Sequence, residues 1–352
     1  TPILRAATLD EMHSRLYAHR PEVNGFAYGF AESTINGERV LRHEGNNPGM
    51  SSSTLFLIPE QQAGVYVAYN SNGSFGPGEE LRSAFFNHFY PTVATPTTPV
   101  ALAPEQVEAI TGAYRPTRRF YDTFAKMMPL FVPAYGDVTL QPDSDGTFVV
   151  AGLAATPLTY APVAPDHLRL LSGAEDGWGD LWFEASETGR ITTLFVENQP
   201  YKAFDKLAWS QRADLHRIIG IVSWLIVAST LAVSAVVWLL RRRWPLPAWI
   251  DVQPAAWGLL LGGSLLMLLF PAALLLTIEE AYLYGVTALF VVALALPVLA
   301  LGLAGASAVV TFAGRSRGRW GNIGAAYYGV ILAAMVVLAW WLHYWNLLGW
   351  RF

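Results

Sequence analysis

Few side chains in this sequence could serve as activated nucleophiles. The chain has 352 residues and no cysteine, which excludes thiolate chemistry and disulfides. A serine can instead be activated by a lysine in a Ser-x-x-Lys pair. The sequence has three lysines, Lys126, Lys202 and Lys206. The residues three positions before them are Thr123, Gln199 and Ala203, so no such pair occurs.

Other catalytic, cofactor and metal motifs are also missing. The sequence contains no Walker loop, no dinucleotide-binding GxGxxG, no HExxH and no GxSxG elbow. Its seven histidines are scattered, without metal-ligand spacing. Asp143-Ser-Asp145-Gly146 could open a calcium loop, but the twelfth position is Ala154, where that loop needs an acidic ligand. We therefore expect a simple turn here, and neither a cofactor nor a bound metal.

One short run places a histidine and a glycine at the end of a predicted strand. This run, His43-Glu44-Gly45, belongs to a longer series of segments. The series is Phe26-Ala-Tyr-Gly-Phe30, His43-Glu-Gly45, Pro48-Gly-Met-Ser-Ser52, Ile58-Pro-Glu60 and Gly64-Val-Tyr-Val-Ala-Tyr-Asn70. In this order and spacing, the series resembles the C-terminal end of the β-lactamase-related serine hydrolases. That family includes class C β-lactamases, penicillin-binding proteins, related esterases and D-amino-peptidases. The resemblance covers residues 3–90.

The resemblance implies particular catalytic roles. His43-Glu44-Gly45 would occupy the third active-site motif, where lactamases carry Lys-Thr-Gly on the strand beside the nucleophile. Gly45 would let a substrate lie close to that strand, and the backbone N–H of Asn46 would donate to the oxyanion hole. His43 would position the substrate or tune the lysine of the first motif. Glu44 departs from the small or hydroxyl residue often found there. The implied substrates are small peptides, esters or β-lactams.

The two other motifs of the family do not occur in usable positions. Ser-x-x-Lys is absent, and Tyr-x-Asn occurs only as Tyr344-Trp-Asn346, at the end of a predicted membrane helix. We therefore expect this chain by itself to be inactive. We also expect it to be the C-terminal fragment of a longer serine hydrolase, since no initiator Met or secretory signal is visible. The alternative is a non-catalytic membrane-anchored protein that binds a ligand or serves as a receptor or transport-associated subunit.

Residues 1–92 are expected to form the C-terminal part of an α/β β-lactamase-like (transpeptidase-like) fold. A helix over residues 8–19, with Thr8 as its N-cap, and a helix over 78–89 flank four predicted strands. The predicted strands are Gly25–Ala31, Arg39–His43, Ser52–Ile58 and Gly64–Tyr69. Turn residues such as Asn36-Gly37 separate them. Such a unit would leave a large face of its sheet without a partner.

A proline- and threonine-rich linker, residues 93–102, is expected to precede a small antiparallel β domain over residues 103–211. Asp145-Gly146 and Thr188-Gly189 are predicted hairpin turns between alternating runs. The segments Ile110–Arg115 and Asp145–Val149 are similar to the accessory β domains that follow some members of the family. An aromatic and basic run in this region could touch the membrane surface, but we expect it to pack at the core and rim. The run is Arg118, Arg119, Phe120, Tyr121 and Phe124.

Residues 215–350 are expected to form a membrane domain with four transmembrane helices. Four apolar stretches, at residues 218–240, 255–278, 281–312 and 323–348, reach the length of about 20 residues that a spanning helix needs. None contains an internal Asp, Glu, Lys or Arg. His343, among belt aromatics, fits an interfacial residue better than a proton relay. Gly258 and Gly262 form a GxxxG pair that we expect to pack inside the bundle.

Basic residues predict how these helices are oriented. Arg241-Arg242-Arg243 follows the first stretch, and Arg315, Arg317 and Arg319 lie between the third and fourth. The predicted loop with Glu279-Glu280 has no basic residue. By the positive-inside rule, the N-terminal domains lie outside the cytoplasm, attached to the inner or plasma membrane of what is expected to be a bacterial cell. The lipid bilayer is thus one expected partner. The net charge of −4, without a basic stripe, gives no reason to expect nucleic acid.

Overall fold

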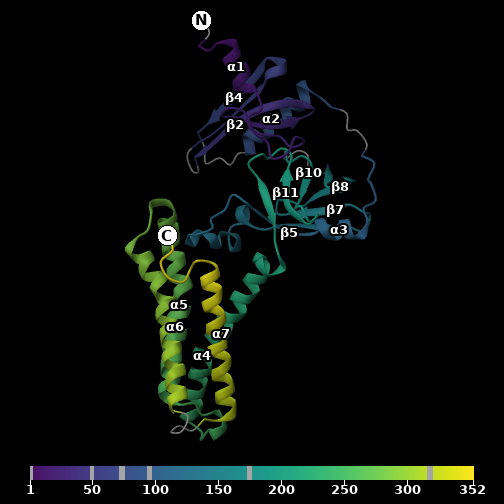
Figure 1. Cartoon of the computed structure of the whole chain (residues 1–352). Coiled ribbons are helices and arrows are strands. Elements are labelled where there is room, and N and C mark those ends of the chain that lie inside the picture. The colour runs from purple at the N-terminus through teal and green to yellow at the C-terminus, as the bar shows by residue number, and fades with distance from the viewer. Residues whose placement is uncertain (1–2, 48–50, 71–75, 93–96, 173–176, 315–319) are drawn as a thin grey trace. The chain divides into compact units, whose positions relative to one another are not determined.

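The chain folds into two compact units in the computed structural model, which describes residues 3–47, 51–70, 76–92, 97–172, 177–314 and 320–352. Residues 1–118 and 133–209 make up the first unit, and residues 119–132 and 210–352 make up the second. The first unit contains a small sheet and a β barrel, and the second contains four long helices (Figure 1).

A four-stranded antiparallel sheet, in the order β1-β2-β3-β4, opens the first unit. Its elements are helix α1 (Ala6–His13), β1 (Ala31–Ile35), β2 (Glu38–Asn47), β3 (Ser51–Ile58), β4 (Ala63–Tyr69) and helix α2 (Gly76–Phe89). The predicted strands at 39–43, 52–58 and 64–69 are thereby confirmed, as is the helix at 78–89. The turn at Asn36-Gly37 is also confirmed, and both of its residues have positive φ. Such a turn matches the twist of the flanking strands.

Two predictions at the start of the sheet are wrong. Gly25–Ala31 is not a strand, because only single bridges form at Phe26 and Gly29 takes a φ of 81° that turns the chain. The first helix is capped by Arg5 rather than Thr8 and ends at His13. Tertiary contacts end that helix, since Arg15 reaches the carboxylate of Glu32 instead of continuing it. Pro48-Gly49 of the predicted turn lies outside the described residues.

The two faces of the sheet are buried to different degrees. Val40, Phe56 and Ile58 form a core with Phe86 of α2, and all four are fully buried. On the opposite face Leu55 and Leu57 are only partly buried. Tyr66, on the same face, is 67% exposed. This face is therefore covered less completely than the face against α2, although Leu41 on it is fully buried.

Eight antiparallel strands close into a barrel in the order β10-β11-β12-β5-β6-β7-β8-β9. The strands are β5 (Gly112–Pro116), β6 (Val138–Pro142), β7 (Phe148–Ala151), β8 (Leu158–Ala164), β9 (His167–Ser172), β10 (Leu181–Ala185), β11 (Ile191–Val196) and β12 (Ala203–Lys206). Helix α3 (Pro104–Ile110) precedes β5. The turns at Asp145-Gly146 and Thr188-Gly189 are confirmed, and both glycines have positive φ. The small antiparallel β region predicted from the sequence is thus present.

The barrel interior is filled by apolar side chains. Tyr114, Phe148, Tyr160 and Phe183 are among the largest fully buried residues of the chain. The Tyr114 hydroxyl donates to the carbonyl of Ile110, so its polar end is satisfied in the core. An eight-stranded barrel is just wide enough for its side chains to fill it. The described interior of this barrel is therefore a hydrophobic core.

A buried amide joins the sheet to the barrel. Asn198 Oδ1 accepts from the Thr34 N–H at 2.8 Å and from Asn24 Nδ2 at 2.7 Å. Asn198 Nδ2 donates to the Thr34 carbonyl at 3.1 Å. The side chain of Asn198 therefore satisfies both backbone groups of Thr34 on the outer edge of β1, as a neighbouring strand would. From the sheet side, Arg42 Nη2 donates to the Asn198 carbonyl at 2.9 Å.

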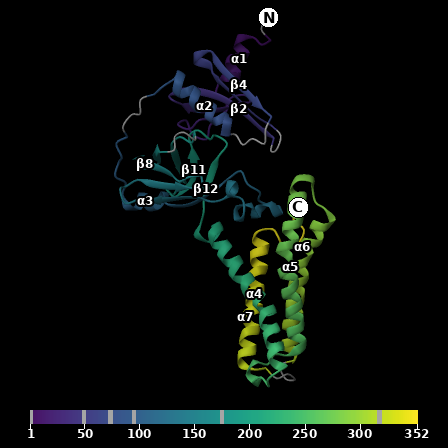
Figure 2. The same cartoon turned by 180° about the vertical axis from the view of Figure 1, so that it is seen from behind.

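The second unit has four helices that are long and apolar enough to cross a membrane. They are α4 (Ala213–Arg241), α5 (Pro254–Tyr284), α6 (Ala288–Gly314) and α7 (Asn322–Tyr344). Opposite views show α5 beside α6 (Figures 1 and 2). Four long apolar helices, as the sequence predicts, are thus present in the described part of the chain. Glu279 and Glu280 lie inside α5 rather than in a loop, because this helix continues until Gly285, whose φ is 99°.

Two details of the helical unit correct the sequence interpretation. A Cβ on Gly263 would lie 2.8 Å from the Ala300 carbonyl oxygen, so Gly263 is where α5 and α6 approach closely. Of the predicted pair, Gly262 packs inside the bundle, where an added Cβ would lie 3.5 Å from Leu303 Cδ1, whereas Gly258 meets nothing within 4 Å, so its expected packing role is wrong.

Residues 119–132, which follow β5, pack with the helices, and Phe124 is buried against Phe290. Packing of the aromatic run is thus confirmed at Phe124. Arg315, Arg317 and Arg319 lie outside the described residues.

Candidate functional site

The end of β2 is an open strand edge. Strand β1 pairs with β2 only as far as Ala31 opposite Arg42. Strand β2 continues to Asn47, and in the described part of the chain this extension pairs with β3 alone, up to Asn47 opposite Ser51. One side of residues 43–46 is therefore available to pair with another extended backbone.

The register indicates which backbone groups face that open side. Ile35 and Glu38 flank the two-residue turn, and residues that flank such a turn exchange hydrogen bonds. Every second residue of β2 repeats this direction, so the backbone groups of Arg42 also face β1. By the same alternation, those of Glu44 and Asn46 face outward beyond the end of β1. The N–H of Asn46 thus points to the open edge.

The three residues predicted for the site, His43, Gly45 and Asn46, lie together on this strand end. His43 is exposed, and its Nδ1 lies 2.7 Å from the Gly29 carbonyl. Gly45 lies on the same face, where an added Cβ would lie 3.0 Å from Ser53 Oγ. Because Gly45 has no side chain, nothing projects from the strand at this position next to His43. The arrangement can bind an extended acyl or peptide segment along the edge and can direct an N–H at its carbonyl oxygen.

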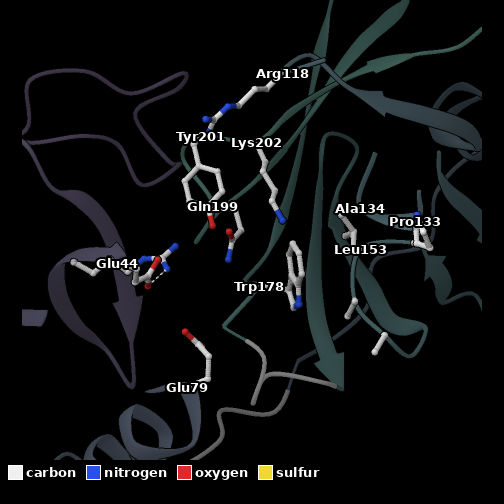
Figure 3. A pocket seen from close by; sticks show the side chains of 14 residues that line it. Glu44, Glu79, Arg118, Pro133, Ala134, Leu153, Trp178, Gln199, Tyr201 and Lys202 are labelled. Carbon is white, nitrogen blue, oxygen red and sulfur yellow. Dashed lines mark hydrogen bonds and ion pairs between the residues drawn. The ribbon is translucent and has the colours of Figure 1, made fainter. Parts of the chain in front are cut away.

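The opposite face of the same strand borders a hollow that the sequence did not predict. Arg42 is 4% exposed, and its Nη1 lies 2.6 Å from Glu44 Oε1. Both residues line a cavity of about 800 Å³ (Figure 3). The remaining wall comes from Glu79 of α2 and from the barrel, with Arg118, Trp178, Gln199, Tyr201 and Lys202 among its members.

The ammonium group of Lys202 lies against aromatic rings in this cavity. Its Nζ is 4.3 Å from the ring centroid of Trp178 and 5.8 Å from that of Tyr201. Figure 3 shows the lysine extending toward the indole. Burial, and to a smaller extent the nearby charge of Arg42, lower the pKa of Lys202 to about 8. The amine therefore loses its proton just above neutral pH.

Sequence reasoning missed the cavity because its walls are far apart in the chain. In the sequence Lys202 has no serine three positions before it, and Trp178 and Tyr201 belong to no motif. The one signal in the sequence is weak: the aromatic residue Tyr201 directly precedes Lys202, and lysine is rare in this chain. Among the described residues, no group of three or more His, Cys, Asp or Glu side chains could hold a metal ion.

Comparisons with known proteins give little further information. No protein-family model matches the chain, and no curated protein matches it. Six chains of solved structures match, including a crystal structure of SurE with D-Leu and a crystal structure of SurE. The first is 15% identical over 58% of this chain and 44% of that chain, with a TM-score of 0.33. The second is 16% identical over 58% and 43%, with a TM-score of 0.32.

The chain therefore spans less than half the length of these two SurE chains. A likeness with TM-scores this low shows neither a shared fold nor a shared activity.

Proposed function

We propose that this chain is the substrate-binding C-terminal part of a membrane-anchored, β-lactamase-related serine hydrolase that acts outside the cytoplasm. Its substrates would be small peptides, esters or β-lactams. The single observation that carries the proposal is the open end of β2, where His43, Gly45 and the outward N–H of Asn46 share one strand edge. This is the arrangement that the resemblance to the third family motif requires.

The proposed mechanism begins with an extended substrate that pairs with β2 along residues 43–46. A serine hydroxyl attacks the substrate carbonyl, and the hydroxyl proton passes to a base and then to the leaving group. As negative charge develops on the carbonyl oxygen, this oxygen accepts a hydrogen bond from the Asn46 N–H. Water then hydrolyses the acyl-enzyme. The sequence holds no Ser-x-x-Lys, so this serine and its lysine must come from residues outside it.

The test uses the complete product of the reading frame that encodes this chain, reconstituted in lipid and treated with a fluorescent β-lactam or fluorophosphonate probe. Asn46→Pro removes the proposed donor at an edge position that tolerates proline. Asn46→Ala is the matched control, because it keeps the N–H and loses only the side chain. We expect acylation to fall by about 100-fold or more in Asn46→Pro and to change little in Asn46→Ala. Equal labelling of both variants would refute the oxyanion role.

The proposed location also has a direct test, since the chain has no native cysteine. Ser144→Cys, in an exposed barrel turn, should react with a membrane-impermeant maleimide in intact cells. Arg243→Cys, just after α4, should react only after the cells are permeabilised. The opposite pattern would place the first unit inside the cell.

A second candidate function is non-catalytic ligand binding. It is favoured by the absence of Ser-x-x-Lys and of a usable Tyr-x-Asn from all 352 residues. The acylation experiment separates the two functions, because a binding protein would show no covalent labelling in any variant. In that case the open edge of β2 would remain as a peptide-pairing surface without chemistry.

A further inference from the structure

The cavity between the sheet and the barrel is lined on one side by positively charged side chains. It is separate from the proposed oxyanion position, since neither His43 nor Asn46 lines it. A neighbouring hollow of about 650 Å³ shares Arg118, Trp178, Tyr201 and Lys202 with it. These four residues therefore form the centre of one continuous binding surface on the outside of the barrel.

The acidic residues of the cavity are already paired. Glu44 forms an ion pair with Arg42 at 2.6 Å. Glu79 forms one with Arg82. In the described part of the chain, no carboxylate lies within ion-pair distance of Lys202. The cavity thus has an excess of positive charge.

This excess charge lies in a partly dry environment. The Lys202 ammonium is flanked by Trp178 and Tyr201, whose rings exclude water from two sides. A charge with reduced hydration gains more from an opposite charge than one in bulk water. The second cation, Arg118, is exposed and lies at the rim, next to Tyr201 in Figure 3. A planar guanidinium is suited to bidentate recognition of a carboxylate.

The size and lining of the cavity indicate the rest of the ligand. Pockets of about 300–1,000 Å³ hold small organic ligands, and this one is about 800 Å³. Trp178, Tyr201 and Leu153 offer apolar and aromatic surface, which favours an apolar side chain. We propose that the cavity binds a carboxylate carried on a body of amino-acid size, either an acylated amino acid or the C-terminus of a short peptide. Lys202 and Arg118 hold the carboxylate, and Trp178 and Tyr201 contact the body.

The binding test uses the whole chain in detergent micelles and isothermal titration calorimetry. The probe is N-acetyl-phenylalanine, and its uncharged amide is the matched ligand control. We expect the acid to bind at least tenfold more tightly than the amide. N-acetyl-Ala-Ala-Phe distinguishes the two sources, because tighter binding of the tripeptide identifies a peptide terminus and equal or weaker binding identifies a single residue. Equal affinities for acid and amide would overturn the proposal.

The variants separate the cationic wall from the general charge of the barrel. Lys202→Met should weaken binding of the acid at least tenfold, and Arg118→Gln should weaken it several-fold. Arg190→Gln removes an exposed arginine that does not line the cavity and should leave the affinity within twofold. Lys202→Arg keeps the charge and should retain binding, which guards against a loss of fold in Lys202→Met. An unchanged affinity in Lys202→Met would overturn the proposal.

A pH profile gives a readout that a purely structural role of Lys202 would not change. The charged groups around this amine are Arg42 and Glu44 on β2, Glu79 and Arg82 on α2, and Arg118 on the barrel side, and the phenol of Tyr201 is a further titratable group there. Since the pKa of Lys202 is lowered to about 8, binding of the acid should weaken as pH rises through that value. In Lys202→Arg the loss should disappear from this range, because a guanidinium stays protonated. An identical profile in both proteins would contradict the assigned role.

Discussion

The barrel and the small sheet are both antiparallel, but only the barrel closes on itself. Each barrel strand has two neighbours, and the interior is filled by side chains such as Phe148 and Tyr160. The sheet has two edges and one half-exposed face, and β2 extends beyond the end of β1. Unpaired strand groups can bind another backbone, whereas a closed barrel has none to offer.

This difference separates a scaffold from a binding region. The described interior of the barrel is a hydrophobic core, and the outer surface of the barrel contributes Trp178 and Lys202 to the cavity wall. The sheet contributes the strand end at residues 43–46, one face of which borders the same cavity. Recognition in the first unit therefore depends on the open sheet and on the outside of the closed barrel.

The prediction with the largest expected effect replaces a core residue of the barrel with alanine. Phe148 is 2% exposed. Phe148→Ala should cost about 3–5 kcal/mol of unfolding free energy, because it removes a buried ring and leaves a cavity. Leu55→Ala, on the half-exposed sheet face, should cost about 1 kcal/mol, since less apolar area is lost. Urea unfolding in detergent, followed by near-UV circular dichroism, measures both. Equal costs would mean that the sheet face is as well packed as the barrel.

The buried carboxylate of Glu32 should produce the next largest effect. Its side chain is 0% exposed, and it pairs with Arg15 and Arg39 at 2.5 Å each. Burial opposes ionisation, but hydrogen bonds from Arg39, the Gly25 N–H and Arg15 outweigh it and hold the pKa of Glu32 below its usual value of 4.5. Glu32→Gln breaks both pairs and should cost about 3 kcal/mol at neutral pH.

The lowered pKa of Glu32 also predicts a pH dependence with a definite sign. Its contribution to stability is fully present above pH 4.5, the unfolded value, and is lost as the pH falls through the lower folded value. Unfolding midpoints measured between pH 3 and 7 should therefore drop in acid for the native chain. The drop should be smaller in Glu32→Gln, and an equal drop would assign the acid sensitivity to other carboxylates.

Much of the fold could be predicted from local patterns. The turn at Asn36-Gly37 and the barrel turn at Gly146 use residues that accept positive φ, and alternating runs flank them. The four membrane helices were recognisable from length and hydropathy alone. These signals are local, since each depends on neighbouring residues in the sequence.

The failures arose where long-range contacts decide the structure. Residues 14–19 leave the helical path because Arg15 binds Glu32 and Tyr17 bridges Phe26. His43, Gly45 and Asn46 could be named because one short segment carries them. The cavity at Lys202 could not, since its lining residues are spread along the sequence from Arg42 to Lys202 and meet only after folding.

A smaller effect should come from the amide that joins the sheet to the barrel. Asn198→Ala leaves the part-buried Thr34 N–H and the buried Asn24 Nδ2 without their shared acceptor. The expected cost is about 2 kcal/mol, the usual penalty for an unsatisfied buried group. The control is Asn87→Ala, which removes one exposed hydrogen bond with Asn36 and should cost far less. Similar costs in both variants would show that the sheet does not depend on the barrel.

The smallest expected effect compares a buried with an exposed carboxylate, because the same arginine forms an ion pair with each. Arg39 lies 2.5 Å from the fully buried Glu32 and 3.7 Å from Glu60, which is 53% exposed. An exposed ion pair contributes about 0–1 kcal/mol, since water and salt screen it. Glu60→Gln should thus change the unfolding free energy by less than about 0.5 kcal/mol. In a double-mutant cycle with Arg39→Met, the coupling of Arg39 to Glu32 should exceed its coupling to Glu60 several-fold. Equal couplings would mean that burial does not determine the strength of these ion pairs. The buried pair at the sheet edge would then stabilise the sheet no more than the exposed pair on its surface.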